Sequence, residues 1–249
     1  MSNIIRNHAM ACRFFNEVVC YGISEEGKKG KALLAQTIFR ANKEGGYART
    51  NQKTGNRFCS LAEDDFLSAI RELDDLTPSI DGLTLYASAV PVDMAAAGRL
   101  FLSDMVAATL PLVGNKEQYD QLMASIPRKY FSALEKSPTK KGLIHYDVDV
   151  ESYDDMQDTS LHRLKERLDE SEAYNRVVTT RGGFHVFADP RAMAYASSIY
   201  GIKNREEAFS RLIQDSIGGK ITECQPCNSI MCPLPGAVQR DGDYIVCLY

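Results

Sequence analysis

The sequence predicts an α+β protein with two parts, a mainly helical N-terminal module over residues 1–78 and a larger domain over residues 79–249. Three observations predict this organisation. Apolar residues recur at helical spacing in the first part, strand-like and helix-like segments follow the order β-α-β-β-α-β after residue 142, and a glycine-rich turn near residue 182 separates two short runs. That order is typical of ferredoxin-like and RNA-recognition-type (RRM-like) sheets, whose first and third strands lie side by side at the centre.

Spacing and capping predict the helices of the N-terminal module. Residues 31–43 place apolar side chains at helical intervals and stop at Gly45-Gly46. Residues 47–59 are polar and predict a loop. A second helix should follow Ser60 and run to about residue 73, because Glu63 stands three residues on and completes a capping box.

Residues 79–142 predict one strand and two helices. The strand covers residues 82–88, and a long helix rich in Ala and Leu starts at about Asp93. A second helix runs from Asn115, a good N-cap residue, to about residue 135, before a basic turn over residues 136–142.

The last third of the chain has the clearest pattern. Residues 181–183 (Arg-Gly-Gly) suit a tight hairpin turn, because glycine accepts positive φ. Acids at positions 206 and 207 mark the first turn of a helix. The predicted strands are 143–150, 176–180, 184–187 and short segments near 220–223, 228–232 and 244–248, and the predicted helices are 157–170 and 204–217.

Composition and charge restrict the location and the partners. No apolar run approaches the roughly 20 residues that a membrane span needs, and the first 20 residues mix charged and apolar side chains unlike a signal peptide. We therefore expect a cytoplasmic protein with no membrane partner. The net charge of −4 argues against a general nucleic-acid coat.

One segment nevertheless carries strong positive charge. Between Lys28 and Arg57 there are eight basic residues and a single acid, Glu44, for a net charge of +7. Such a segment can hold a phosphate backbone, and Lys53, Arg57, Lys140 and Lys141 are the candidate nucleic-acid-binding residues. The alternative is a solvated surface segment.

The seven cysteines are more consistent with thiols than with disulfides in a reducing compartment. Cys224-x-x-Cys227, followed by Cys232, hints at zinc. A structural zinc site needs four ligands and no fourth lies nearby in sequence, so buried thiols are the alternative.

The strand over residues 143–150 carries the candidate chemistry. Side chains alternate across a strand, so Asp147 and Asp149 share one face, while Tyr146, Val148 and Val150 face the other way. Two adjacent carboxylates repel each other unless a cation lies between them. Hard oxygen ligands suit Mg²⁺ or Mn²⁺, which act in pairs on phosphoryl displacement. The alternative is two acids at a solvated strand end.

His185 begins the third strand of the unit and should therefore lie beside the two aspartates. There it could contact the phosphates or sugar of a metal-bound nucleotide, and Arg181 on the turn could add a fork for phosphate oxygens. A single histidine is otherwise more often structural.

At these residues the sequence resembles the archaeo-eukaryotic primase (AEP) superfamily. The family's signatures are an hhDhD strand, a small-x-His strand, and a third acid ahead of Leu-Pro-Gly. The matching segments are 144–149 (Ile-His-Tyr-Asp-Val-Asp), 179–186 (Thr-Thr-Arg-Gly-Gly-Phe-His-Val) and 233–236 (Pro-Leu-Pro-Gly). Residues 85–91 also look like the region before the catalytic strand in viral and mobile-element members. The resemblance covers roughly residues 80–249.

The resemblance implies an AEP-like core with an RRM-like catalytic subdomain after a helical or αβ N-terminal module. It also implies a primase or primase-polymerase in DNA replication, with two Mg²⁺ or Mn²⁺ ions, nucleoside triphosphates and a single-stranded template. Asp147 and Asp149 would bind metal, and His185, Arg181 and Gly183 would bind the nucleotide. Gly183 stands where many members have serine. A helicase would be a separate protein, because the chain has no Walker-type motif.

Three residues compete to be the third acid, where the family usually has aspartate. Asp241 and Asp243 fall in an Asp-Gly-Asp turn, which gives them a sufficient structural reason. Glu223 lies on a short stretch that could form a strand beside the first. We therefore take Glu223 as the third catalytic and metal-binding acid.

Three alternatives remain open. A GT-A-type glycosyltransferase also uses an Asp-x-Asp pair for Mn²⁺, although its Rossmann-like start does not match this element order. An RNA-recognition-like module would stack bases on exposed aromatic residues, where this strand presents acids. A catalytically inactive AEP-like nucleic-acid-binding protein is the third.

Overall fold

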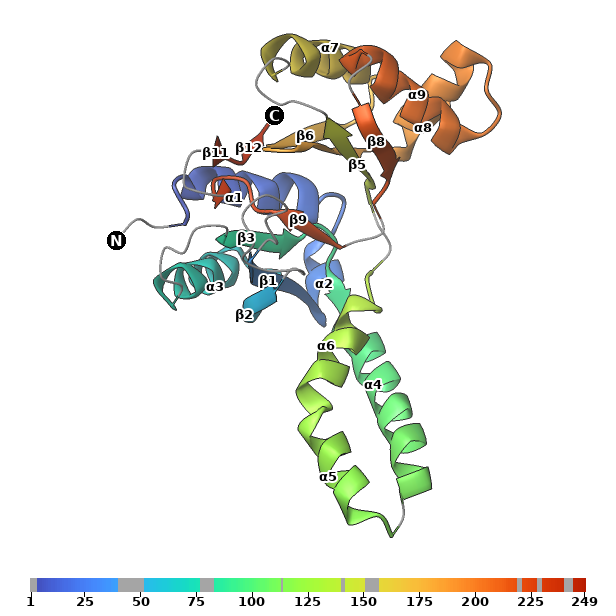
Figure 1. The fold of residues 1–249 in the computed structure, drawn as a ribbon. Helices are drawn as coiled ribbons and strands as arrows, with labels where there is room; N and C mark the ends of the chain where they lie inside the picture. Colours follow the sequence, from blue (N-terminus) through green and yellow to red (C-terminus); the bar gives the residue numbers. More distant parts are fainter. Residues whose placement is uncertain are drawn as a thin grey trace.

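The computed structural model describes residues 4–39, 52–76, 83–112, 114–139, 142–150, 157–218, 221–227, 230–239 and 244–249. Helices and antiparallel sheets confirm the predicted α+β class. Figure 1 shows one sheet in the upper part of the molecule, a second below it with helix α1 between them, and a helical arm that projects away from both.

The upper sheet has the strand order β12-β6-β7-β5-β8, and every pairing in it is antiparallel. The first and third strands of the predicted unit, β5 and β7, therefore lie next to each other near its centre. The elements are β5 (Ile144–Val150), α7 (Gln157–Asp169), β6 (Asn175–Thr180), β7 (Gly183–Ala188), α8 (Pro190–Tyr200), α9 (Arg205–Ile217), β8 (Ile221–Pro226) and β12 (Cys247–Leu248).

Helix α8 was not predicted, so two helices stand where the sequence indicated one. The signals for it are present. Asp189 caps the helix through a hydrogen bond from the Arg191 amide, Pro190 occupies the first turn, and Gly201 ends the helix with φ of +64°.

Alternation along β5 decides which face of the upper sheet is buried under helices. Tyr146 and Val148 are buried and pack in one cluster with Phe209 and Leu212 of α9 and Leu164 of α7. Burying apolar side chains of this size contributes roughly 1.5–3 kcal/mol each. Helices α7 and α9 thus cover one face, as Figure 1 shows, and the aspartates point to the other.

The lower sheet corrects the prediction for the N-terminal module. Residues predicted as a helix form strand β1 (Lys31–Phe39), and much of the predicted loop forms β2 (Gln52–Ser60). Residues 32–37 are all buried, which indicates a strand covered on both faces. Such a short apolar run has no decisive periodicity, so pairing with β2 and with β3 (Leu83–Ser88) determines its conformation.

The lower sheet joins strands from both sides of the predicted domain boundary. Its order is β2-β1-β3-β9, with β9 at Met231–Pro233 and the short β4 (Val92–Asp93) also pairing with β1. The boundary at residue 78 stays a prediction. The described strands show that β1 and β2 hydrogen-bond into the same sheet as β3 and β9.

A buried core connects the two sheets through the N-terminal helices α1 (His8–Phe14) and η1 (Phe15–Val19). The Phe14 ring meets Phe187 of the upper sheet edge-on at 6.2 Å between centroids. Phe15 stacks at 5.1 Å on Phe66 of α3 (Glu63–Leu76), which packs on the lower sheet. The short helix α2 (Glu25–Lys28) lies between η1 and β1 in the chain.

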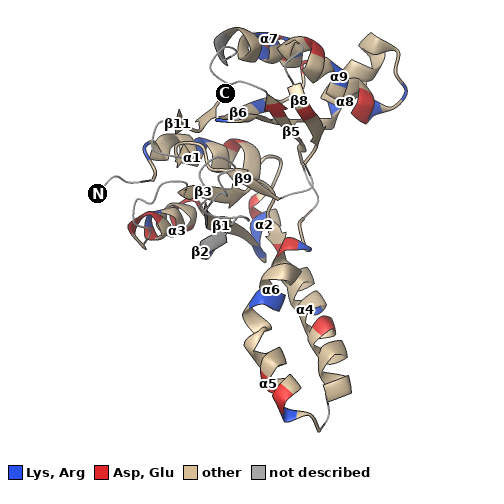
Figure 2. Ribbon diagram, viewed as in Figure 1, with Lys and Arg blue, Asp and Glu red and all other residues tan. Residues whose placement is uncertain are grey.

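The arm consists of α4 (Met94–Thr109), η2 (Leu110–Leu112), α5 (Lys116–Ala124) and α6 (Ile126–Glu135). The helix predicted from Asp93 is confirmed, whereas the one predicted from Asn115 is two helices that meet at Ser125. The arm is mostly uncharged in Figure 2, and Leu102 and Val106 of α4 and Leu110 of η2 are exposed.

The segment Met94–Leu112 is an exception to the expectation that no run has the length of a membrane span. By length and composition alone, it is the one helix in the described ranges that could cross a membrane. A single such helix is weak evidence. The location of the protein therefore stays a prediction.

Candidate functional site

Strand register brings the predicted acids and His185 onto one face of three neighbouring strands. Asp147 lies directly opposite His185 of β7 on one side and Gln225 of β8 on the other. Asp149 lies opposite Gly183 and Glu223 in the same way. Opposed residues in antiparallel strands point to the same face with Cα atoms roughly 4.5–5.5 Å apart. Asp147, Asp149, Glu223 and His185 thus share the face away from α7 and α9.

Exposure rises along this face. His145 and His185 are buried, with 4% and 7% of their surface exposed. The Asp147 side chain is 42% exposed, and Asp149 and Glu223 are exposed. The N-terminal helices cover the inner end of the face, so the carboxylates lie at its open end.

Position 183 requires glycine because the backbone of the neighbouring strand β5 lies very close to it. Its φ is +157°, and a Cβ atom there would lie 1.8 Å from the carbonyl oxygen of Val148 on the neighbouring strand. No side chain fits without moving one strand. The serine that many AEP members have at this position is therefore sterically excluded here, and the predicted nucleotide-binding role of Gly183 could involve only its backbone.

Replacing Gly183 with serine should destabilise the fold by about 3 kcal/mol or more, because the strand pairing of β5 and β7 must open. Urea unfolding followed by circular dichroism measures this change. Gly182→Ala is the matched control, since its Cβ would meet only Asp149 Oδ1, at 3.9 Å. Equal stability of the Gly183→Ser variant and the wild type would contradict the steric argument.

The hairpin between β6 and β7 is tight as predicted, but its turn is one residue shorter than the predicted Arg181-Gly182-Gly183, because Gly183 is already part of β7. Thr180 pairs with Gly183, which leaves Arg181 and Gly182 as the turn. The Arg181 amide donates to Oε1 of Gln239 at 2.8 Å, and the Val150 amide donates to the Gly182 carbonyl at 2.9 Å. The turn is therefore fixed beside Asp149, with the Arg181 residue exposed.

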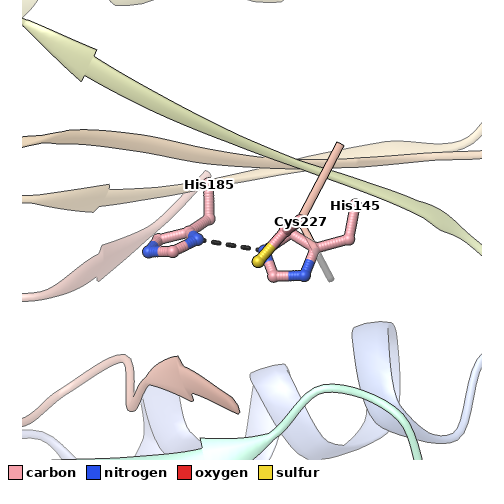
Figure 3. A group of neighbouring side chains, drawn as sticks. All are labelled: His145, His185 and Cys227. Carbon is pink, nitrogen blue, oxygen red and sulfur yellow. Dashed lines mark hydrogen bonds between the residues drawn. The ribbon is translucent and has the colours of Figure 1, made fainter. Parts of the chain in front are cut away.

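The two histidines form a close pair. Nε2 of His145 lies 3.0 Å from Nδ1 of His185, and that same Nδ1 lies 3.6 Å from Oδ1 of Asp147. The His145 ring also stacks on Phe187 at 4.3 Å between centroids, with 22° between the planes. Figure 3 shows the second ring nitrogen of His185 on the edge away from His145.

Cys227 joins the histidine pair from the end of β8. Its Sγ and one nitrogen of each histidine all lie within 4.8 Å of one another, and its amide donates to the His145 carbonyl at 2.8 Å. Among the described residues, no other three His, Cys, Asp or Glu side chains bring their ligand atoms so close together. Asp147, Asp149 and Glu223 share a face without forming such a group.

The three-cysteine zinc hypothesis is wrong in its choice of ligands. Cys224 faces the opposite side of the sheet, with Sγ 4.0 Å from the Ser210 carbonyl of α9, and burial raises the pKa of its thiol to about 11. Cys232 lies in β9 and is fully buried, and burial raises the pKa of its thiol. The side chains whose ligand atoms form a close group with Cys227 are His145 and His185.

Of the candidate nucleic-acid-binding residues, Arg57 lies on the lower sheet, apart from the carboxylates of the upper sheet. Arg57 is on β2, the outer strand of the lower sheet, where its Nε pairs with Oε2 of Glu72 at 2.9 Å. Lys28 pairs with Glu25 at 2.7 Å and Lys29 pairs with Glu26 at 2.7 Å. Acids just outside the basic segment thus offset part of its charge. The Lys53 side chain, Lys140 and Lys141 lie outside the described residues, as do the competing acids Asp241 and Asp243.

Comparison of the chain with family models, curated proteins and solved structures finds no match. The resemblance to AEP enzymes therefore stays an expectation, together with the activity, metals and partners that it implies.

Proposed function

We propose that the protein is a metal-dependent nucleotidyltransferase, a primase or primase-polymerase that adds nucleotides on a single-stranded template. One observation carries the proposal. Asp149 lies directly opposite Glu223, and Asp147 directly opposite His185, on one face of three neighbouring strands. Three carboxylates therefore lie toward the open end of this face, with the His185 imidazole beside Asp147 at its more buried side.

The chemistry of these donors supports a hard divalent cation. The carboxylates of Asp147, Asp149 and Glu223 at an exposed strand end repel one another, and this repulsion is relieved when a cation binds. Oxygen donors fit Mg²⁺ or Mn²⁺, which would supply charge neutralisation for the triphosphate and for the attacking hydroxyl. The antiparallel order with β5 and β7 at its centre supports assignment of this sheet to an RRM-like catalytic subdomain of an AEP-like core.

The remaining side chains fit the triphosphate. His185 presents a ring nitrogen on the edge away from His145, which can donate to a phosphate oxygen (Figure 3). Arg181, on the turn beside Asp149, can donate two parallel hydrogen bonds to phosphate oxygens. Both groups would orient the nucleotide and neutralise its charge.

The alternative functions have less support. A glycosyltransferase of the GT-A type needs a parallel, Rossmann-like sheet, whereas the pairings of β5 with β7 and β8 are antiparallel. An RNA-recognition-like binder needs exposed aromatic rings on this face, whereas Phe187 is buried and the exposed positions there include acids. An inactive AEP-like protein differs from our proposal only in activity.

A primer-synthesis assay tests the proposal. The purified chain is incubated with single-stranded DNA, labelled deoxynucleotides or ribonucleotides, and Mg²⁺ or Mn²⁺. We expect template-dependent products that chelation with EDTA abolishes. Template and nucleotide binding without product under every combination would instead favour the inactive AEP-like protein.

A further inference from the structure

We propose that His145, His185 and Cys227 form a binding site for one zinc ion, separate from the carboxylates that we assign to Mg²⁺ or Mn²⁺. The site lies on the same face of the upper sheet as the carboxylates, toward its buried end. This proposal does not depend on the proposed function, because it concerns a different metal and a ligand set without the three carboxylates; His185 is common to both.

The separation of the ligand atoms fits tetrahedral zinc. Zinc binds histidine nitrogen at about 2.0–2.1 Å and cysteine sulfur at about 2.3 Å, so tetrahedral geometry places two nitrogens roughly 3.4 Å apart and nitrogen and sulfur roughly 3.6 Å apart. Here the two nitrogens are 3.0 Å apart, and all three ligand atoms lie within 4.8 Å of one another. Small side-chain rotations would bring them to these distances.

Three strands hold the ligands in place before any metal binds. His145 is on β5, and His185 on β7 lies opposite Asp147, two residues farther along β5 on the same face. Cys227 follows directly on β8, where the hydrogen bond from its amide to the His145 carbonyl fixes its position. Stacking on Phe187 fixes the His145 ring. A ligand set anchored on rigid strands needs little reorganisation to bind an ion.

Ligand type selects the ion. Thiolate and imidazole are borderline or soft donors that favour zinc, whereas Mg²⁺ and Mn²⁺ favour oxygen. Three protein ligands leave a fourth tetrahedral position, which water can fill. Zinc binding through Nδ1 of His185 would leave the ring proton on Nε2. The proposed function needs a donor at Nε2, and this one detail rests on that function.

Two measurements on the full chain test the site. Titration with ZnCl₂ against a chromophoric chelator should give one tight site per chain. Replacement of zinc with Co²⁺ should give the visible bands of tetrahedral Co²⁺ and a sulfur-to-cobalt charge-transfer band in the near ultraviolet. No tight zinc binding, or a Co²⁺ spectrum without the sulfur band, would overturn the proposal.

Variants assign the ligands. Cys227→Ser should abolish the sulfur band and weaken zinc binding about 100-fold or more, and His145→Gln should weaken it similarly. Cys224→Ser is the matched control, because Cys224 lies three residues before Cys227, on β8, and faces α9. Circular dichroism checks the fold of each variant. If His145→Gln unfolds, Cys227→Ser still tests the site, because Cys227 is only partly buried. Wild-type zinc affinity in Cys227→Ser would refute the site.

Discussion

Replacing Asp149 with asparagine should lower nucleotide transfer by about 1,000-fold or more and leave the fold intact. Loss of one metal-binding carboxylate removes several kcal/mol of transition-state stabilisation, and each 1.4 kcal/mol is about a factor of ten in rate. The side chain is exposed at the open end of β5, so no core packing is lost. Removing one of two repelling charges should leave the apo protein as stable as before or slightly more stable.

Primer extension measures the rate, and calorimetric titration with Mn²⁺ plus nucleotide measures binding. Asp147→Asn should behave like Asp149→Asn in both. Asp215→Asn is the control, because Asp215 is a partly exposed acid on α9, which covers the other face of the sheet, and its loss should change neither quantity. Wild-type binding and rate in both Asp147→Asn and Asp149→Asn would exclude the metal assignment.

Local patterns predicted the upper sheet well, because its signals are local. Alternation along residues 144–150 and the Arg-Gly-Gly turn identified strands that the structure places within about a residue of the expected limits. The prediction of a helix over residues 31–39 was wrong because the signals that determine this segment are not local. Their conformation depends on pairing with residues 52–60 and 83–87, which are distant in sequence and gave no decisive signal.

The same distinction applies to the site. Alternation alone put Asp147 and Asp149 on one face, and it also puts His145 there, two residues earlier, although the sequence analysis assigned His145 no role. Cys227 could not be grouped with the histidines without the register of β8 against β5. The shared face of Asp149 and Glu223 depends on that register too, and the expectation of a strand beside β5 anticipated it.

Glu223 is the residue that decides between a two-metal and a one-metal site. It stands directly opposite Asp149 in the pairing of β5 with β8 and is exposed on the same face. A second ion needs a carboxylate beyond the Asp-x-Asp pair to bridge or orient it. Glu223→Gln should therefore lower the rate about 100-fold and raise the Mn²⁺ concentration needed for half-maximal rate.

Three variants make this last prediction decisive. Glu223→Asp keeps the charge and matches the residue usual in AEP enzymes, so it should restore much of the rate, which a purely structural role for Glu223 would not require. Asp241→Asn and Asp243→Asn should retain both rate and metal dependence, since the turn predicted from the sequence is a sufficient reason for aspartate at each position. The measurement is extension rate against Mn²⁺ concentration at fixed nucleotide and template.

A loss of rate in Asp241→Asn or Asp243→Asn, with no loss in Glu223→Gln, would assign the third acid to that turn. Unchanged behaviour in all three neutralising variants would leave Asp147 and Asp149 as the only acids at the site, sufficient for one ion.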